Sequence, residues 1–269
     1  MKFAICNETF QGWDWARTCS FISALGYDGV EIAPFTLAED VRSLTPGARR
    51  TIRQMAADAG LDIVGLHWLL VSPKGLSATT NEEPVRRETS DYLLALVDFC
   101  AELNGKVLVF GSPRQRTIPD GATREQTTAR FLDTVRPALE RAGRSGIAIC
   151  FEPLPPPEAD FLLTLAEARE LVQQAAHPAA RTIFDVKSAS SEGRPLEDLV
   201  REFAPLIAHV HANDANRRGP GFGETDFRPV LRALRDAGYA GYVSVEVFDY
   251  SPDPETIARE SLRYLRACL

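Results

Sequence analysis

Eight short apolar runs alternate with longer segments of helical periodicity along almost the whole chain. In the longer segments apolar residues recur three and four positions apart and glycine often follows the last turn, which is typical of amphipathic helices. A strand followed by a helix, repeated eight times, can bury its apolar runs by closing a parallel barrel with the helices outside. The alternation therefore predicts one α/β domain over residues 1–269, a (β/α)8 TIM barrel.

The predicted strands are short, and their ends are marked by polar residues, glycine or proline. They cover residues 2–6, 29–34, 62–68, 106–112, 148–153, 182–187, 207–214 and 242–248. The clearest helical segments cover residues 49–60, 88–105, 127–143 and 226–241. The alternation continues across the proline-rich segment 153–158, so we expect this segment to be a stiff loop over the barrel mouth and not a linker between domains.

Composition and charge exclude several classes of protein. The formal net charge is −7 and no basic stripe is visible, which argues against nucleic acid as a partner. No apolar run approaches the roughly 18 residues of a membrane span, and the N-terminal segment becomes polar too early for a signal peptide. The five cysteines are widely spaced without a CxxC motif, so we expect reduced cysteines in a cytoplasmic protein.

Four polar residues stand at the ends of consecutive predicted strands: Glu152, Asp185, His211 and Glu246. The carboxyl ends of parallel strands form one face of a barrel, so these side chains should converge there. Any one buried carboxylate can be balanced by Arg or Lys, but three carboxylates and an imidazole at successive strand ends favour a divalent metal ion.

The motifs around these residues resemble those of a known family. The segments FEP, FDV, HVHANDANRRGPGFG and SVEVF, which contain the four residues, are similar to segments of the xylose-isomerase-like TIM barrels, the sugar phosphate isomerases and epimerases. The site is most similar to that of the D-tagatose/D-allulose 3-epimerase branch. The resemblance implies that all four residues are metal ligands, that the ion is Mn²⁺, Mg²⁺ or Co²⁺, with Mn²⁺ favoured, and that the protein forms a homodimer or homotetramer. Zn²⁺ also suits this donor set.

The implied reaction moves a proton next to the carbonyl group of a sugar, through an enediolate whose charge the metal ion stabilises. Glu152 and Glu246 are the expected catalytic residues, because carboxylates on opposite faces of the reacting carbon can remove and return the proton. The resemblance further implies that Glu158 assists Glu152 or contacts the sugar, and that Arg217 binds the substrate.

Two features depart from the pattern of the 3-epimerases. Where they carry a substrate-binding histidine, this chain has Ser188, preceded by Lys187, whose cation can take over that contact if it points into the site. His67, at the end of the third predicted strand, is expected to bind substrate at the mouth, with a packed, hydrogen-bonded histidine as the alternative. Trp68 should then face the opposite way, because side chains alternate along a strand.

Other predictions stay open at this level. A lyase or hydratase that expels a β-leaving group from a 3-keto-sugar or keto-glycoside is the alternative to an isomerase or epimerase. A multi-zinc apurinic endonuclease, which shares this barrel, is disfavoured by the small number of histidines and the net charge.

Alternatives also stay open for single residues. Glu31 either pairs with an arginine or orients a ligand. Arg114 and Arg116 either bind substrate or lie in a solvated loop. No phosphate-binding motif is evident, which favours an unphosphorylated sugar.

Overall fold

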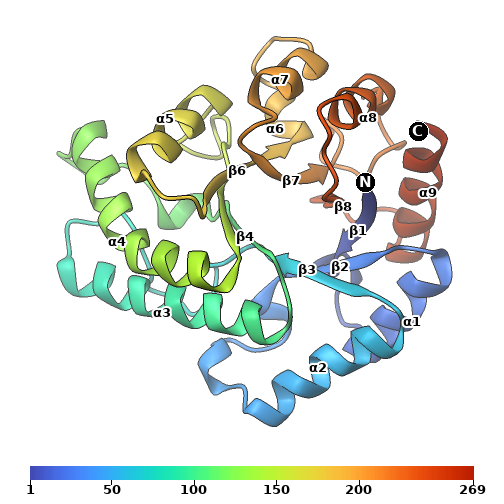
Figure 1. The fold of residues 1–269 in the computed structure, drawn as a ribbon, viewed down its shortest axis with the longest axis horizontal. Helices are drawn as coiled ribbons and strands as arrows, with labels where there is room; N and C mark the ends of the chain where they lie inside the picture. Colours follow the sequence, from blue (N-terminus) through green and yellow to red (C-terminus); the bar gives the residue numbers. More distant parts are fainter.

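The computed structural model describes residues 1–269 as a closed ring of eight parallel strands with helices around it (Figure 1). The strands are β1 Lys2–Cys6, β2 Gly29–Ile32, β3 Asp62–Leu66, β4 Val107–Phe110, β5 Ala148–Phe151, β6 Ala180–Asp185, β7 Ile207–Ala212 and β8 Tyr242–Val245. Each strand pairs with its neighbours in the sequence, and β1 closes the ring by pairing with β8. The predicted TIM barrel is confirmed.

At least one helix follows each strand and covers the outside of the barrel (Figure 1). The helices are α1 Trp15–Leu25, α2 Pro46–Asp58, α3 Glu83–Glu102, α4 Arg124–Ser145, α5 Leu165–Ala175, α6 Val186–Ser190, α7 Leu196–Phe203, α8 Phe227–Asp236 and α9 Pro254–Ala267. The short helix α6, which comes before α7, was not predicted. It begins directly after β6 and therefore lies at the barrel mouth.

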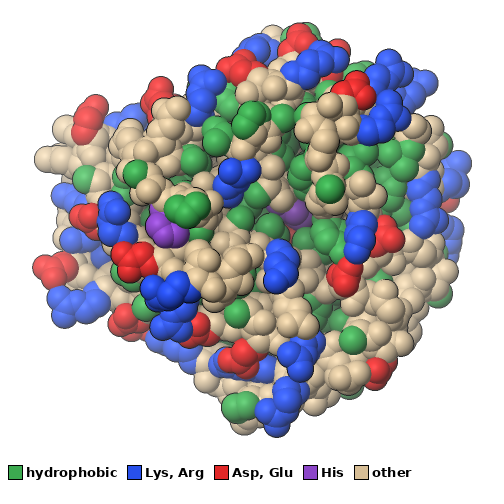
Figure 2. All heavy atoms as spheres, in the orientation of Figure 1, with side chains coloured by type: hydrophobic (Ala, Val, Ile, Leu, Met, Phe, Trp, Pro, Cys, Tyr) green, Lys and Arg blue, Asp and Glu red, His purple; other side chains and the backbone are tan.

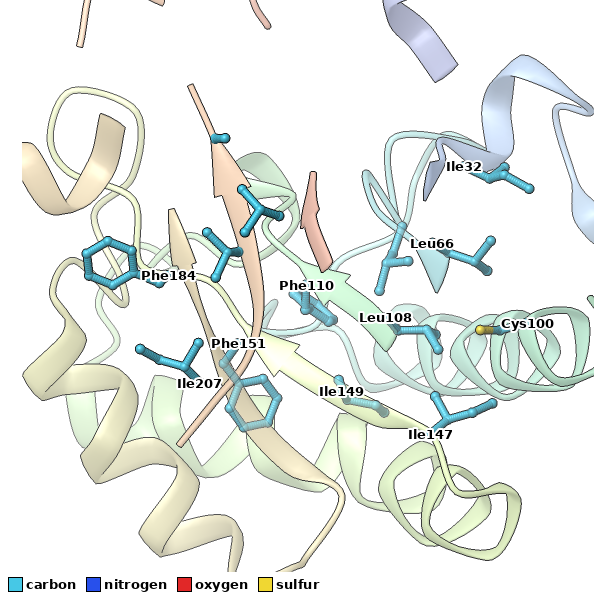
Figure 3. Close-up of a cluster of buried hydrophobic side chains, with 14 of the residues drawn as sticks. Ile32, Leu66, Cys100, Leu108, Phe110, Ile147, Ile149, Phe151, Phe184 and Ile207 are labelled. Atoms are coloured by element: carbon cyan, nitrogen blue, oxygen red, sulfur yellow. The ribbon is translucent and has the colours of Figure 1, made fainter. Parts of the chain in front are cut away.

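Two apolar cores result from the alternation of side chains along the strands. The large core lies between the strands and the helices, where Phe110 of β4 and Phe151 of β5 project outward (Figure 3). Their rings pack at 5.0 and 5.3 Å from that of Phe131 on α4. The core inside the barrel is much smaller and consists of Ala4, Val64, Val107, Val109, Cys150 and Ile183. The barrel interior above it is consequently left to polar side chains.

Local signals in the sequence account for the ends of the helices. Helix α4 starts with a capping box, in which the Thr123 hydroxyl accepts from the Gln126 backbone and the Gln126 side chain accepts from the Thr123 backbone. It ends at Gly146, whose φ of +64° is the left-handed conformation that glycine adopts without strain. These caps direct the chain into β5 and so position the strand end that carries Glu152.

The surface carries both signs of charge. On the face that Figure 2 shows, Lys and Arg side chains are interspersed with Asp and Glu, and neither sign forms a broad patch. This pattern agrees with the absence of a basic stripe in the sequence. None of the helices has the length and apolarity needed to cross a bilayer.

Candidate metal centre

The four residues at the ends of β5 to β8 converge at the barrel mouth. Glu152 and Glu246 each follow the last residue of their strand, Asp185 ends β6, and His211 is the penultimate residue of β7. One ligand atom of each residue lies within 4.8 Å of those of the other three. All four side chains are buried. The convergence expected from the strand ends is therefore present.

The strand ladder holds the two glutamates in place beyond the strand ends. The backbone N–H of Glu152 donates to the carbonyl of Phe110 at 3.2 Å, and that of Glu246 donates to the carbonyl of Ala212 at the same distance. Because the ladder continues, both side chains keep the inward direction of the residues two positions earlier, Cys150 and Ser244.

His211 shows that the cluster suits a cation. Its Nδ1 atom lies 3.1 Å from Glu246, 3.5 Å from Glu152 and 3.9 Å from Asp185, but it makes no hydrogen bond. Its Nε2 atom lies 3.2 Å from Glu31. With the proton on Nε2, Nδ1 presents a lone pair to three carboxylates, and a divalent metal ion removes the resulting repulsion. The donor set therefore fits such an ion.

Residues outside the predicted set hold the four side chains of the cluster in position. Glu31, fully buried on β2, accepts from His209 at 2.8 Å as well as facing His211, and no arginine pairs with it. These contacts support the prediction that Glu31 orients a ligand, and not the alternative that it pairs with an arginine. Asn213 donates to Asp185 at 2.6 Å and to Glu246 at 3.2 Å. Sequence reasoning missed Asn213, because an amide two residues after His211 carries no signal of its own.

The environment separates the pKa values of the two glutamates. Burial raises the pKa of Glu152, and the neighbouring charge of Glu246 adds to this effect. Burial also acts to raise the pKa of Glu246, but the interactions of its carboxylate with the nearby imidazoles of His211 and His67 outweigh burial and lower this pKa. Without a bound ion, the two carboxylates therefore differ in how readily they ionise.

His67 lies beside the cluster and is 1% exposed. Its Nε2 atom lies 2.9 Å from Glu8, and its Nδ1 atom lies 3.3 Å from Glu246. Glu8, in the single turn Asn7–Phe10 after β1, was not predicted, because nothing in the local sequence distinguishes it from a surface glutamate. His67 is thus hydrogen-bonded and also faces the site.

A narrow cleft opens above the cluster. Its lining residues are His67, Trp68, Gly111, Ser112, Pro113, Glu152, Leu154, Glu158, Glu246 and Phe248. The segment 153–158 thus contributes to the mouth, as expected of a loop over it. The prediction that Trp68 faces away from His67 is wrong. Strand β3 ends at Leu66 and Trp68 has a left-handed φ of +51°, so strand alternation no longer applies.

The Lys187 side chain reaches two residues that line the cleft, Glu158 and Phe248, whereas Ser188 lies against Asp185. The Lys187 ammonium group donates to both carboxylate oxygens of Glu158, at 2.7 and 2.9 Å, and lies 4.7 Å from the centre of the Phe248 ring. The backbone N–H of Ser188 donates to Asp185 at 2.6 Å, and its buried hydroxyl has no hydrogen-bond partner. Helix α6 therefore directs the lysine towards the cleft.

Of the three arginines considered from sequence, Arg114 is exposed, and the other two occupy different environments. Arg217 is exposed at the rim, with a left-handed φ of +71° and its guanidinium 5.5 Å from the centre of the Phe248 ring. Arg116 is fully buried and donates to the backbone carbonyls of Gly111 and Glu152 at 2.8 Å each. The expectation of a solvated or substrate-binding Arg116 is wrong, because its side chain instead ties the end of β4 to the end of β5.

The sequence profile of the Xylose isomerase-like TIM barrel family matches residues 19–268. The chain belongs to this family. The resemblance read from the four motifs is thereby confirmed.

Two relatives are similar over most of the chain. A 3-dehydro-D-guloside 4-epimerase of Escherichia coli (strain K12) is 26% identical over 277 aligned positions, which cover 100% of both chains. A D-psicose 3-epimerase of Agrobacterium fabrum is also 26% identical and covers 84% of this chain and 77% of its own length. Among solved structures, D-psicose 3-epimerase in the presence of D-fructose superimposes with a TM-score of 0.87 at 22% identity, covering 100% of this chain and 99% of its own. That structural likeness supports the fold.

Proposed function

We propose that this protein is a divalent-metal-dependent epimerase of keto sugars, with Glu152, Asp185, His211 and Glu246 as the metal ligands and Mn²⁺ as the ion. The observation that carries the proposal is the pairing of Glu152 and Glu246. Both line one cleft, both belong to the four-residue cluster, and their environments move their pKa values in opposite directions. Two carboxylates with separated pKa values are what proton removal and return require.

The bound ion would stabilise the negative charge that develops on the sugar oxygens when the proton leaves the neighbouring carbon. Glu246, as the ionised carboxylate, removes that proton, and Glu152 delivers a proton to the opposite face. In the reverse reaction the two residues exchange roles. Asn213 and Glu31 keep the ligands oriented, since they hold Asp185, Glu246 and His211 through hydrogen bonds.

The walls of the cleft divide into an apolar and a polar part. Trp68 and Phe248 lie edge to face with their centroids 6.4 Å apart, and they offer ring surfaces to the C–H groups of a sugar. The ion pair between Lys187 and Glu158 lies on the polar side. We propose that it takes the place of the histidine that the 3-epimerases carry at position 188, and that Arg217 contacts the outer end of the substrate.

Two groups of keto sugars are candidates, since the names of the relatives include both a free ketose and a 3-dehydro-glycoside. The decisive experiment incubates Mn²⁺-loaded protein in D₂O with D-fructose, D-tagatose, D-psicose and a 3-keto-glucoside, followed by NMR. Epimerisation predicts deuterium at a carbon next to the carbonyl together with a new epimer. We expect Glu246→Gln to reduce exchange by about 10²–10⁴-fold, and Glu170→Gln, on the exposed side of α5, to leave it unchanged.

The other outcomes of this experiment are equally informative. Release of the aglycone or of water from the 3-keto-glucoside, without a new epimer, would select the alternative lyase or hydratase reaction. Absence of deuterium exchange with every sugar, in protein that contains the metal, would contradict the proposed chemistry.

A further inference from the structure

His67 repeats the hydrogen-bonding arrangement of the metal ligand His211. In each imidazole Nε2 faces a buried carboxylate, Glu8 at 2.9 Å for His67 and Glu31 at 3.2 Å for His211. In each, Nδ1 faces Glu246 and makes no hydrogen bond. A carboxylate on one ring nitrogen fixes the proton there and leaves the other nitrogen as a ligand. The mechanism proposed above uses only His211.

Glu246 lies between the two imidazoles and presents a different oxygen to each. Its Oε2 atom lies 3.1 Å from Nδ1 of His211, and its Oε1 atom lies 3.3 Å from Nδ1 of His67. Ligand atoms at adjacent positions around an ion are roughly 3.0–3.4 Å apart when each bond is about 2.1 Å. The space between His67 and Glu246 therefore has the dimensions of a coordination edge.

The balance of charge at the mouth favours a further cation. Five carboxylates are buried there, namely Glu8, Glu31, Glu152, Asp185 and Glu246. The buried ammonium group of Lys187 is paired with Glu158, and the buried Arg116 donates to backbone carbonyls. Even when Glu152 holds a proton, the other four carboxylates carry more negative charge than one divalent ion compensates, and uncompensated buried charge is strongly unfavourable.

From these observations we propose a second divalent-cation site, with His67 Nδ1 and Glu246 Oε1 as protein ligands and Glu8 as the residue that orients His67. Glu8, His67 and Glu246 form a group separate from the first cluster, and the two groups share only Glu246. His67 and Glu246 both line the cleft, so the remaining coordination positions face water or substrate oxygens. The site rests on the first one, because Glu246 bridges the two.

The test is the binding stoichiometry of Mn²⁺. EDTA-treated wild-type protein is titrated with Mn²⁺ alone by equilibrium dialysis, and EPR spectra are recorded at one and at two equivalents. We expect two ions per chain, the second weaker than the first, and a spin-coupled EPR signal that appears with the second equivalent. The coupling is expected because one carboxylate bridges two ions in a site of this type, which are about 3.5–4 Å apart.

His67→Gln removes Nδ1 but keeps an amide donor near the Nε2 position that faces Glu8. This variant should bind one ion, with the affinity of the first site changed by less than about threefold. Glu8→Gln should weaken the second ion by about 10-fold or more, as is usual when the partner of a ligating histidine is lost. His177→Asn, on the loop after α5, should retain both ions.

The outcomes separate this proposal from the proposed function. A wild-type protein that binds a single Mn²⁺ up to millimolar concentration, without a coupled signal, overturns the second site and leaves the first intact. Two ions in His67→Gln would show that His67 is not a ligand. If the wild-type protein binds no ion, both proposals fail. The wild-type EPR measurement decides the matter even if His67→Gln does not fold.

Discussion

At the scale of single residues, the ion pair between Lys187 and Glu158 is the feature that distinguishes this site from the 3-epimerase pattern. The Lys187 side chain is only 6% exposed, so removing Glu158 leaves a buried positive charge without its partner. Removing Lys187 has a smaller cost, because the Glu158 side chain is 28% exposed and water can solvate it. We therefore expect Lys187→Met and Glu158→Gln each to lower kcat/KM by about 10-fold or more. The double variant should be little worse than Lys187→Met alone, with a coupling energy above about 1 kcal/mol.

The measurement is a double-mutant cycle on kcat/KM with the best keto sugar found. A parallel cycle on thermal stability uses the exposed i,i+4 pair of Glu83 and Arg87 on α3, for which a coupling of only about 0.3–0.5 kcal/mol is expected. Strict additivity of Lys187→Met and Glu158→Gln would show that the pair does not act as a unit in the site.

The buried carboxylate of Glu31 leads to a prediction about how stability depends on pH. Burial acts to raise its pKa, but the charges and hydrogen bonds of His209 and His211 outweigh burial and hold this pKa well below its ordinary value. A lowered pKa means that Glu31 contributes stability above about pH 4.3, the ordinary pKa of glutamate, and that this contribution is lost as pH falls further. Glu31→Gln should cost about 3 kcal/mol at pH 7, and the difference from wild type should shrink below about pH 4.

Urea unfolding of the metal-free protein between pH 3.5 and 7 measures this difference. Glu140→Gln, at an exposed position of α4, should match the wild type at every pH. A difference between wild type and Glu31→Gln that stays constant across the range would contradict the assignment of an ionised Glu31.

At the scale of elements, the residue that follows β4, Gly111, lies directly beside the carboxylate of Glu152, which follows β5. A Cβ atom on Gly111 would overlap with the Oε2 atom of Glu152. Gly111→Ala should therefore displace the Glu152 carboxylate and weaken Mn²⁺ binding by about 10–100-fold, the range seen when the support of a ligand is disturbed. Gly47→Ala in the first turn of α2 should have no effect on Mn²⁺ affinity, because its nearest neighbour is 3.7 Å away. Calorimetric titration measures both, and unchanged affinity in Gly111→Ala would show that Glu152 is not held against β4.

The elements also show what was predictable from sequence and what was not. All eight strands could be predicted, because each apolar run is short and is followed by a turn and then by a segment whose apolar residues recur three and four positions apart. The predicted runs extend beyond the real strands at the mouth, for example to residue 68 where β3 ends at Leu66, since apolar residues such as Trp68 also line the cleft. The helix α6 was missed because Val186–Ser190 is a single turn, capped by Asp185, that has no apolar period to reveal it.

The same distinction applies to the site. The convergence of Glu152, Asp185, His211 and Glu246 follows from strand order alone, since consecutive parallel strands place their ends side by side. Their roles as ligands and catalytic groups remain predictions. The contacts of Glu8 with His67 and of Asn213 with Asp185 depend on loop conformation and side-chain direction, and these are set by packing across distant segments, which a single sequence does not reveal.

At the scale of the whole molecule, the barrel is not held together evenly around its ring. The seam between β3 and β4 has only two paired positions, whereas β4 and β5 have four. The four proposed ligands come from β5 to β8, so a bound ion connects half of the ring at its mouth. The remaining strands join that half through the β1–β8 and β4–β5 ladders, and at the mouth two side chains add to this connection, since Glu31 of β2 faces His211 and His67 after β3 faces Glu246.

A ligand that binds only the native protein raises the free energy of unfolding by an amount set by its concentration relative to Kd, about 2.7 kcal/mol at 100 times Kd. The metal-free barrel contains carboxylates that repel one another around an unpartnered His211 nitrogen, so Mn²⁺ should bind the folded chain far better than the unfolded one. For a chain of this length we expect Tm to rise by about 5–10 °C at 100 times Kd, and EDTA should reverse the rise.

Asp185→Asn provides the matched control for this shift. The asparagine keeps an oxygen that can accept from the Ser188 backbone at the start of α6, so this cap should survive while the charge of one proposed ligand and the hydrogen bond from Asn213 are lost. Differential scanning fluorimetry over a Mn²⁺ series should therefore give a much smaller rise in Tm for Asp185→Asn than for the wild type. Equal shifts in the two proteins would mean that the ion binds elsewhere on the barrel. If dialysis detects bound Mn²⁺ but the wild-type Tm does not rise, the unfolded chain binds the ion as well as the folded chain does. The ion would then not hold the ring together.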